Sequence, residues 1–195
     1  MKKYYLASAS PRRKELLGSL GIEFEIMPAV SEEVITDTDP AKVVERLSRQ
    51  KSEEIFHKIL TNESADIVVI GADTVVSYKQ KILGKPKDTD SARSMITMLS
   101  GNVHQVFTGV TVMHRLNGQQ GSVTFHSKTD VEVYEMTEKE IESYISTSEP
   151  YDKAGGYGIQ GLFGRYVKGI SGDYNNVVGL PISELYHVLS NLGLL

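Results

Sequence analysis

The 195-residue sequence contains no cysteine and no long apolar run. The absence of cysteine excludes disulfide bonds, thiolate nucleophiles, and zinc or iron–sulfur centres with cysteine ligands. Because no apolar stretch is long enough to cross a bilayer, we expect a soluble, cytoplasmic protein with no membrane partner. The apolar part of the opening residues, MKKYYLASAS, is short and runs directly into Pro11 and Arg12, so we expect no secretory signal.

The chain also has no excess of positive charge, and its formal net charge at neutral pH is −4. Binding to DNA or RNA over a wide area requires a basic surface, so we expect no nucleic-acid partner. The composition, 40% hydrophobic and 24% charged, is typical of a globular protein. For this length we expect a single α/β domain over residues 1–195, built as two lobes around a cleft.

Apolar spacing alternates between the strand period and the helix period along the chain. Strands are predicted at residues 3–8 and 22–27, a hairpin at residues 65–86, and a longer hairpin from residues 103–115 and 121–136. Helices are predicted at residues 11–21, 40–60, 88–101 and 137–147 and from residue 181 onward. Residues 149–179 read as a long glycine-rich loop, which in a compact domain is usually functional.

The stretch SASPRRKELL begins a helix with two arginines. Ser10 is a predicted N-cap and Pro11 the first helical residue. Cations are unfavourable at this positive end of the helix dipole unless an anion lies among them, so Arg12 and Arg13 indicate a phosphate site. The alternative is that both arginines are solvated surface residues.

Carboxylates follow two of the predicted strands. In VIGADTVV, Asp73 and Thr74 come directly after an apolar strand, and burying such a carboxylate is costly unless it is paired or binds a metal. Glu32 and Glu33 lie in a loop after the strand at 22–27. Together with Asp73 they offer hard oxygen ligands for Mg²⁺ or Mn²⁺. The alternative for Asp73 is an ordinary turn residue.

Two lysines add positive charge to the predicted site. Lys51 falls on or near the apolar face of the helix at 40–60, where a lysine without function commonly extends its charged end to solvent. Lys85 precedes Pro86, which holds its backbone extended and directs it out from the sheet edge.

The glycine-rich segment GYGIQG formally matches a dinucleotide-binding fingerprint, but no apolar strand precedes it and no clear helix opens within it. Its glycines instead permit close approach to a ligand, with Tyr157 and Gln160 as side chains that could face a base. A loop folded on its own glycines is the alternative. The sequence has neither a Walker loop nor a G-x-S-x-G elbow, so the combined charges favour a phosphate-cleaving enzyme outside the P-loop class.

Five motifs in order, SASPRRKELL, SEE, GADTVV with ILGKP, YDKAGGYGIQG and GDYNNVVGLP, resemble the Maf family of nucleoside triphosphate pyrophosphatases. The resemblance covers essentially the whole chain. It implies a mixed central sheet flanked by helices, in two lobes around a deep cleft, similar to the inosine triphosphate pyrophosphatases. It also implies metal-dependent cleavage of a nucleoside triphosphate to the monophosphate and pyrophosphate, with Mg²⁺ or Mn²⁺ as cofactor. The family's cleft positions fall on Ser8, Arg12, Arg13, Glu33, Lys51, Asp73 and Lys85, with Asp73 as the proton acceptor.

The resemblance further separates two subfamilies by three cleft positions. Arg12, Thr74 and Gln160 match the subfamily that acts on dTTP and UTP rather than the one that acts on 7-methyl-GTP, which remains an alternative. The amide of Gln160 can both donate to and accept from the imide edge of thymine or uracil. A nucleotide-sensing regulator of cell division that acts through a protein partner is a second alternative, and the sequence leaves a homodimer open.

Overall fold

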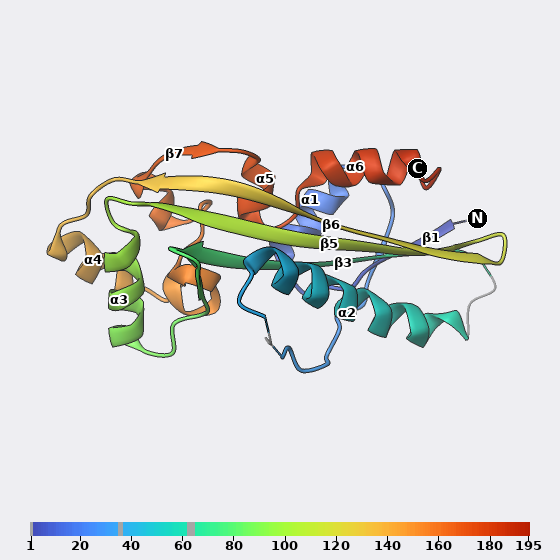
Figure 1. Cartoon of the computed structure of the whole chain (residues 1–195), viewed down its shortest axis with the longest axis horizontal. Helices are drawn as coiled ribbons and strands as arrows, with labels where there is room; N and C mark the ends of the chain where they lie inside the picture. The colour runs from blue at the N-terminus through green and yellow to red at the C-terminus, as the bar shows by residue number, and fades with distance from the viewer. Residues whose placement is uncertain (1, 35–36, 62–64) are drawn as a thin grey trace.

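The computed structural model describes residues 2–34, 37–61 and 65–195, and a seven-stranded mixed sheet runs through it (Figure 1). The strands are β1 (Lys2–Leu6), β2 (Glu25–Ile26), β3 (Asp66–Tyr78), β4 (Lys81–Leu83), β5 (Val103–Leu116), β6 (Gln119–Val133) and β7 (Val167–Ser171). The α-helices are α1 (Pro11–Gly18), α2 (Pro40–Leu60), α3 (Thr89–Leu99), α4 (Glu138–Ile145), α5 (Tyr174–Val178) and α6 (Ile182–Asn191), and three 3₁₀ turns span Glu149–Asp152, Ala154–Gly156 and Leu162–Tyr166. The predicted α/β class with a mixed central sheet is confirmed.

The strands lie in the order β2-β1-β3-β5-β6-β7. β1 is parallel to β2 and β3, whereas β3, β5, β6 and β7 are antiparallel in succession. The two hairpins expected from the sequence are both present, β3 with β4 and β5 with β6. Asn117 and Gly118 turn the longer hairpin with positive φ, a backbone state that Asn and Gly tolerate.

One edge of β3 is shared by two strands that do not meet. β1 pairs with β3 as far as Ile70, and β4 resumes pairing at Val76. Since β5 occupies the opposite edge along this whole stretch, residues 71–75 of β3 have a strand neighbour on one side only. The sheet therefore has an opening at its centre, bordered by the end of β1 and the end of β4.

Helix α2 covers one face of the sheet at unusually close range. Its bounds are those expected, with Asp39 as N-cap and Pro40 in the first turn. A Cβ on Gly71 would lie 2.3 Å from Ser52 Oγ, and a Cβ on Gly109 would lie 2.3 Å from the Val44 carbonyl oxygen. Only glycine allows this approach, which brings the helix backbone directly over the strand positions beside the opening.

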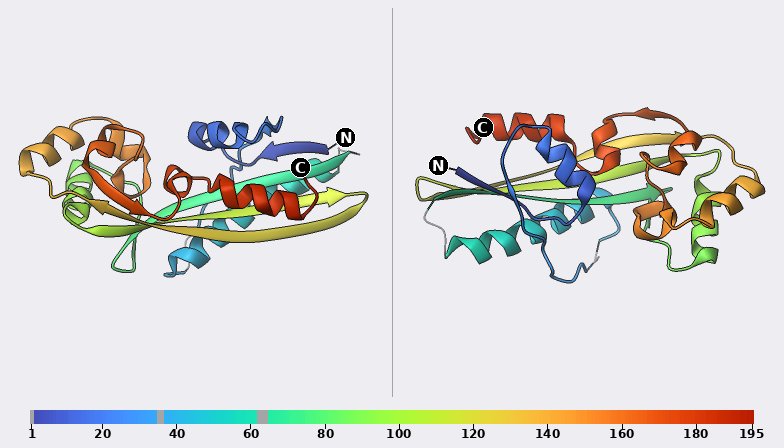
Figure 2. Two further views of the ribbon diagram at one scale, coloured as in Figure 1. Left: turned by 90° about the horizontal axis from the view of Figure 1, so that it is seen from above. Right: turned by 180° about the vertical axis from the view of Figure 1, so that it is seen from behind.

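The other face and the far end of the sheet carry separate hydrophobic clusters. Alternate β3 residues, among them Val68 and Ile70, pack with Leu17 of α1 and Leu185 of α6 on the face opposite α2, and Figure 2 shows α1 and α6 lying together there. At one end, α3, α4 and the 3₁₀ turns form a second cluster around Phe163. Within the described residues, no helix combines the length and apolar character needed to cross a membrane.

Three expectations about secondary structure are wrong. Only residues 25–26 of the strand expected at 22–27 pair with β1, because Ile22 and Phe24 pack instead against the α1 and α6 cluster. Helix α1 ends at Gly18, three residues before the expected Gly21. The segment 149–179 is not a single loop but contains β7 and α5.

Candidate active site

The opening in the sheet gathers most of the predicted site residues. Asp73 and Thr74 lie within β3 at the opening, and Ser8 follows β1 at its border. The expectation that Asp73 comes directly after a strand is wrong, because β3 continues to Tyr78, and a turn residue is excluded. Successive strand residues face opposite sides, so Asp73 meets α2 whereas Thr74 meets α1.

Lys51 of α2 joins two carboxylates at the opening. Its Nζ lies 2.6 Å from Asp73 Oδ1 and 2.6 Å from Glu33 Oε1. Burial raises the pKa of Asp73 above its ordinary value, and the charges of Lys51 and Arg13 oppose this without cancelling it. Burial also raises the pKa of Glu33, but the hydrogen bond and charge of Lys51 outweigh it and hold that pKa below its usual value. Lys51 is therefore part of a charged cluster and not a lysine extended to solvent.

Arg13 is fixed from the other face by neutral oxygens. Its Nε donates to the Gly179 carbonyl at 2.9 Å, Nη1 to Ser8 Oγ at 3.3 Å, and Nη2 to Thr74 Oγ1 at 3.0 Å. Burial lowers the pKa of Arg13, although a guanidinium remains charged in proteins. Among the described residues no carboxylate forms an ion pair with it, so its geometry is set while its charge stays available to an anion.

Ser8 and Ser10 complete the start of α1. Ser10 Oγ accepts the Arg13 backbone N–H at 3.5 Å, as predicted for the N-cap. Ser8 Oγ accepts hydrogen bonds from the Ser10 backbone N–H at 3.2 Å and from Arg13 Nη1. Because both of these groups donate, the hydroxyl proton of Ser8 is left for a ligand.

Arg12 points to a neighbouring cavity of about 280 Å³ that also contains Gln160. Tyr157 and Glu149 line it as well, together with residues of the GYGIQG segment and α5. Gln160 is exposed, as expected for a side chain that faces a ligand. Tyr157 was expected to face a base, and it does line the cavity. Its hydroxyl, however, is hydrogen-bonded to the buried His104 Nε2 at 2.7 Å.

The two remaining predicted residues differ in their relation to the cluster. Lys85 is exposed after β4, and its charge contributes to lowering the pKa of Glu33. Glu32 is exposed, and its backbone carbonyl accepts from Gln50 Nε2 at 2.9 Å. Across the described ranges, no three histidine, aspartate or glutamate side chains converge on one point. The geometry thus brings Glu33 and Asp73 together but leaves Glu32 apart.

The sequence did not predict three residues that hydrogen-bond to the site: Gly179, Thr108 and Glu149. α5 supplies the Gly179 carbonyl, and Gly179 itself has φ 129°, a conformation that favours glycine. Buried Thr108 bonds to Thr74. Glu149, which precedes the GYGIQG segment, accepts the backbone N–H of Leu162, the residue directly after that segment, at 2.8 Å. Gly179 lies in the motif GDYNNVVGLP and Glu149 lies just before YDKAGGYGIQG, whereas Thr108 lies in none of the motifs. The sequence alone does not show which contacts these residues make.

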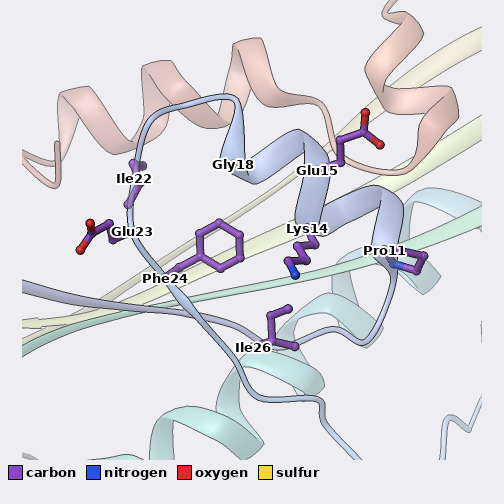
Figure 3. Close-up of a pocket in the computed structure, with 8 residues that line it drawn as sticks. All are labelled: Pro11, Lys14, Glu15, Gly18, Ile22, Glu23, Phe24 and Ile26. Atoms are coloured by element: carbon purple, nitrogen blue, oxygen red, sulfur yellow. The ribbon is translucent and has the colours of Figure 1, made fainter.

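A larger open cavity of about 670 Å³ lies elsewhere, between α1 and the segment leading into β2 (Figure 3). Phe24, Ile22 and Ile26 form its apolar part, and Lys14 and Glu23 its charged part. It contains none of the predicted site residues, so cavity size alone does not identify the functional site.

Comparison with known proteins agrees with the motif resemblance. A family profile described as Maf-like protein matches residues 3–192. A protein named dTTP/UTP pyrophosphatase from Agathobacter rectalis is 55% identical over 99% of this chain and 98% of its own length. Proteins of the same name from Bacillus cytotoxicus and Lachnoclostridium phytofermentans are 47% and 44% identical, with 97% and 100% of this chain covered and 95% and 97% of theirs.

A solved nucleoside-triphosphatase / dITP/XTP pyrophosphatase from Mycobacterium abscessus is 12% identical over 98% of this chain and 94% of that one. Its TM-score of 0.42 is too low to support an argument. The family profile matches residues 3–192 and the relatives are 44% to 55% identical, so the chain belongs to the family of Maf-like proteins.

Proposed function

We propose that this protein hydrolyses dTTP and UTP to the nucleoside monophosphate and pyrophosphate. The relatives' names support the reaction and the substrates. The observation that carries the proposal is the guanidinium of Arg13, held by three neutral oxygens beside the Lys51, Asp73 and Glu33 cluster. A half-buried cation with fixed geometry and, among the described residues, no carboxylate ion-pair partner is suited to bind a phosphate chain.

The carboxylates of Glu33 and Asp73 are suited to a divalent cation. Glu33 and Asp73 converge on one cationic atom, Lys51 Nζ, and the donor set is made of the hard oxygens that Mg²⁺ and Mn²⁺ prefer. Mg²⁺ is commonly held by one or two carboxylates with substrate phosphates completing its shell. When bound, such an ion supplies Lewis-acid charge that neutralises the phosphates. Glu33 and Asp73 would hold it, whereas the exposed Glu32 lies apart from them.

Asp73 is the proposed proton acceptor. Water attacks the α-phosphorus, the bond from that phosphorus to the bridging oxygen breaks, and pyrophosphate leaves. Burial raises the pKa of Asp73 toward the range where a carboxylate is an effective base. Lys51 orients the carboxylate through its hydrogen bond to Oδ1. Arg13, Lys51 and Lys85 supply positive charge to the phosphate chain, and Ser8 donates its free hydroxyl proton to it.

The base is proposed to bind in the cavity that contains Arg12 and Gln160. The amide of Gln160 offers one donor and one acceptor, which complements the imide edge of thymine or uracil. The charge of Arg12 would repel a cationic methylated guanine, and the Gln160 amide offers the donor-rich edge of guanine fewer acceptors than a carboxylate would. This favours the pyrimidine subfamily over the alternative that acts on 7-methyl-GTP.

The experiment is a nucleotide panel with Mg²⁺ or Mn²⁺ followed by identification of the phosphate product. We expect pyrophosphate from dTTP and UTP, little turnover of 7-methyl-GTP, and a loss of at least roughly a hundredfold in Asp73→Asn with the fold intact. Orthophosphate as the first product would refute cleavage at the α-phosphorus. Tight nucleotide binding without turnover would instead support the sensing alternative.

A further inference from the structure

We infer that Thr108 is a positioning residue that holds Arg13 for phosphate binding. It does so through a relay, a chain of hydrogen bonds in which each hydroxyl can donate in one direction only. The relay begins at α5. Thr108 is fully buried in β5, and its Oγ1 lies 2.9 Å from the backbone carbonyl oxygen of Asn176. A carbonyl only accepts hydrogen bonds, so Thr108 must donate its single hydroxyl proton there.

That first bond determines the next one. Thr74 Oγ1 and Thr108 Oγ1 are 2.9 Å apart, and distance alone does not say which donates. Because the Thr108 proton is already used, Thr74 must donate to Thr108. Thr74 then has no proton left, and its oxygen presents only lone pairs to the Nη2 of Arg13 at 3.0 Å, which can only donate.

α5 anchors both ends of this relay. The Asn176 side chain is fully buried, and its Nδ2 donates to the Val106 carbonyl at 3.0 Å and to Thr129 Oγ1 at 2.8 Å. These bonds fix the backbone carbonyl that receives the Thr108 proton. At the end of the same helix the Gly179 carbonyl accepts from Arg13 Nε at 2.9 Å.

The consequence concerns the hydroxyl of Thr74. Without Thr108 Oγ1 as acceptor, that hydroxyl is free to rotate and to direct its proton toward the guanidinium, where it would oppose the Nη2 donor. Arg13 would then lose one of its three fixed contacts, and the position of its charge at the opening would no longer be set. Thr108 forms no hydrogen bond to Arg13 itself and reaches it through Thr74.

The test compares Thr108→Val with Thr108→Ser and a matched control in the full chain. Thr108→Val removes the hydroxyl with little change in shape, whereas Thr108→Ser keeps it. Thr111→Val makes the same change at another fully buried threonine of β5, whose hydroxyl bonds to Ser48 and Thr124 instead. The readouts are kcat/KM for dTTP, the dissociation constant of inorganic pyrophosphate, and urea unfolding.

We expect Thr108→Val to lower kcat/KM and pyrophosphate affinity by roughly tenfold, the scale of a buried hydrogen bond left unmade. Thr108→Ser should restore both, and Thr111→Val should affect unfolding alone. In a Thr74→Val background, Thr108→Val should cause no further loss, because the two residues act in series. Unchanged kcat/KM in Thr108→Val, an equal loss in Thr111→Val, or losses that multiply in the double variant would overturn the inference.

The inference rests on the proposed function for its kinetic readout, and the two fail separately. If the wild-type chain releases no pyrophosphate from dTTP, the proposed function fails, and the pyrophosphate dissociation constant alone then decides the relay. Weaker pyrophosphate binding by Thr108→Val would support it, and unchanged binding would overturn it. A wild-type chain that neither releases nor binds pyrophosphate overturns both.

Discussion

Gly109→Ala should displace α2 and separate Lys51 from Asp73 without changing either side chain. A Cβ at Gly109 would lie 2.3 Å from the Val44 carbonyl oxygen and 2.4 Å from its carbon, both of them backbone atoms of α2. An ordinary contact distance of about 3.5 Å requires the helix to retreat by about 1 Å. The Lys51 Nζ to Asp73 Oδ1 distance, 2.6 Å, would lengthen beyond a good hydrogen bond.

The expected result is a loss of about 100-fold in kcat/KM for dTTP, the scale for a misplacement of this size. Overpacking should also lower the free energy of unfolding by about 1–3 kcal/mol. Steady-state kinetics and urea unfolding measure the two effects. Gly169→Ala in β7 is the control, since a Cβ there meets nothing within 4 Å. Wild-type kcat/KM in Gly109→Ala would refute the claim that close approach of α2 builds the charged cluster.

Three further outcomes are expected. Burial raises the pKa of Asp73 from 3.8, so the folded chain binds that proton more tightly than the unfolded chain does. The stabilisation from this proton is therefore full below pH 3.8 and is lost as the pH rises through the pKa of the folded state. Asp73→Asn should remove this part of the dependence of unfolding free energy on pH, measured by urea titrations at several pH values. An identical slope in both proteins would contradict the shift. Gln160→Glu should reduce kcat/KM for dTTP and UTP more than it lowers the melting temperature, and equal losses would indicate a structural role. Because Glu149 accepts from the backbone N–H groups of Leu162 and Phe163 with different oxygens, Glu149→Gln should place an amide donor against one of them, raise KM for dTTP and speed hydrogen exchange at that residue. Tyr144→Phe removes one donor to the same carboxylate and should change KM less. Equal KM in wild type and Glu149→Gln would count against a loop held by this carboxylate.

Local signals predicted the elements that local chemistry decides. The N-cap Asp39, Pro40 in the first turn and the apolar spacing of Val43, Val44 and Leu47 determine α2 without help from the rest of the chain. The arginines at the start of α1 likewise indicated an anion site, because the helix dipole acts within a single turn.

Contacts between distant segments could not be predicted in the same way. Nothing in the sequence around Lys51 marks it as a residue of a charged cluster. Its partners, Asp73 and Glu33, are distant in the sequence and lie outside α2. The usable signal was Gly71, since a glycine inside an apolar strand commonly marks a close backbone approach. Thr108 carried no signal at all, because a threonine in a strand is ordinary until its neighbours are known.

The carbonyl that fixes Arg13 comes from a residue 166 positions further along the chain, and Lys2 and Tyr4 bond to the carbonyls of Gly193 and Leu194. The first strand and helix therefore stay without these partners until the last helices have been synthesised and docked. Closing so long a loop is slow compared with forming the α2 helix or the two hairpins. We therefore expect Arg13 to acquire its fixed geometry late in folding, so that a chain still lacking its C-terminal helices has the arginine without the carbonyl that orients it.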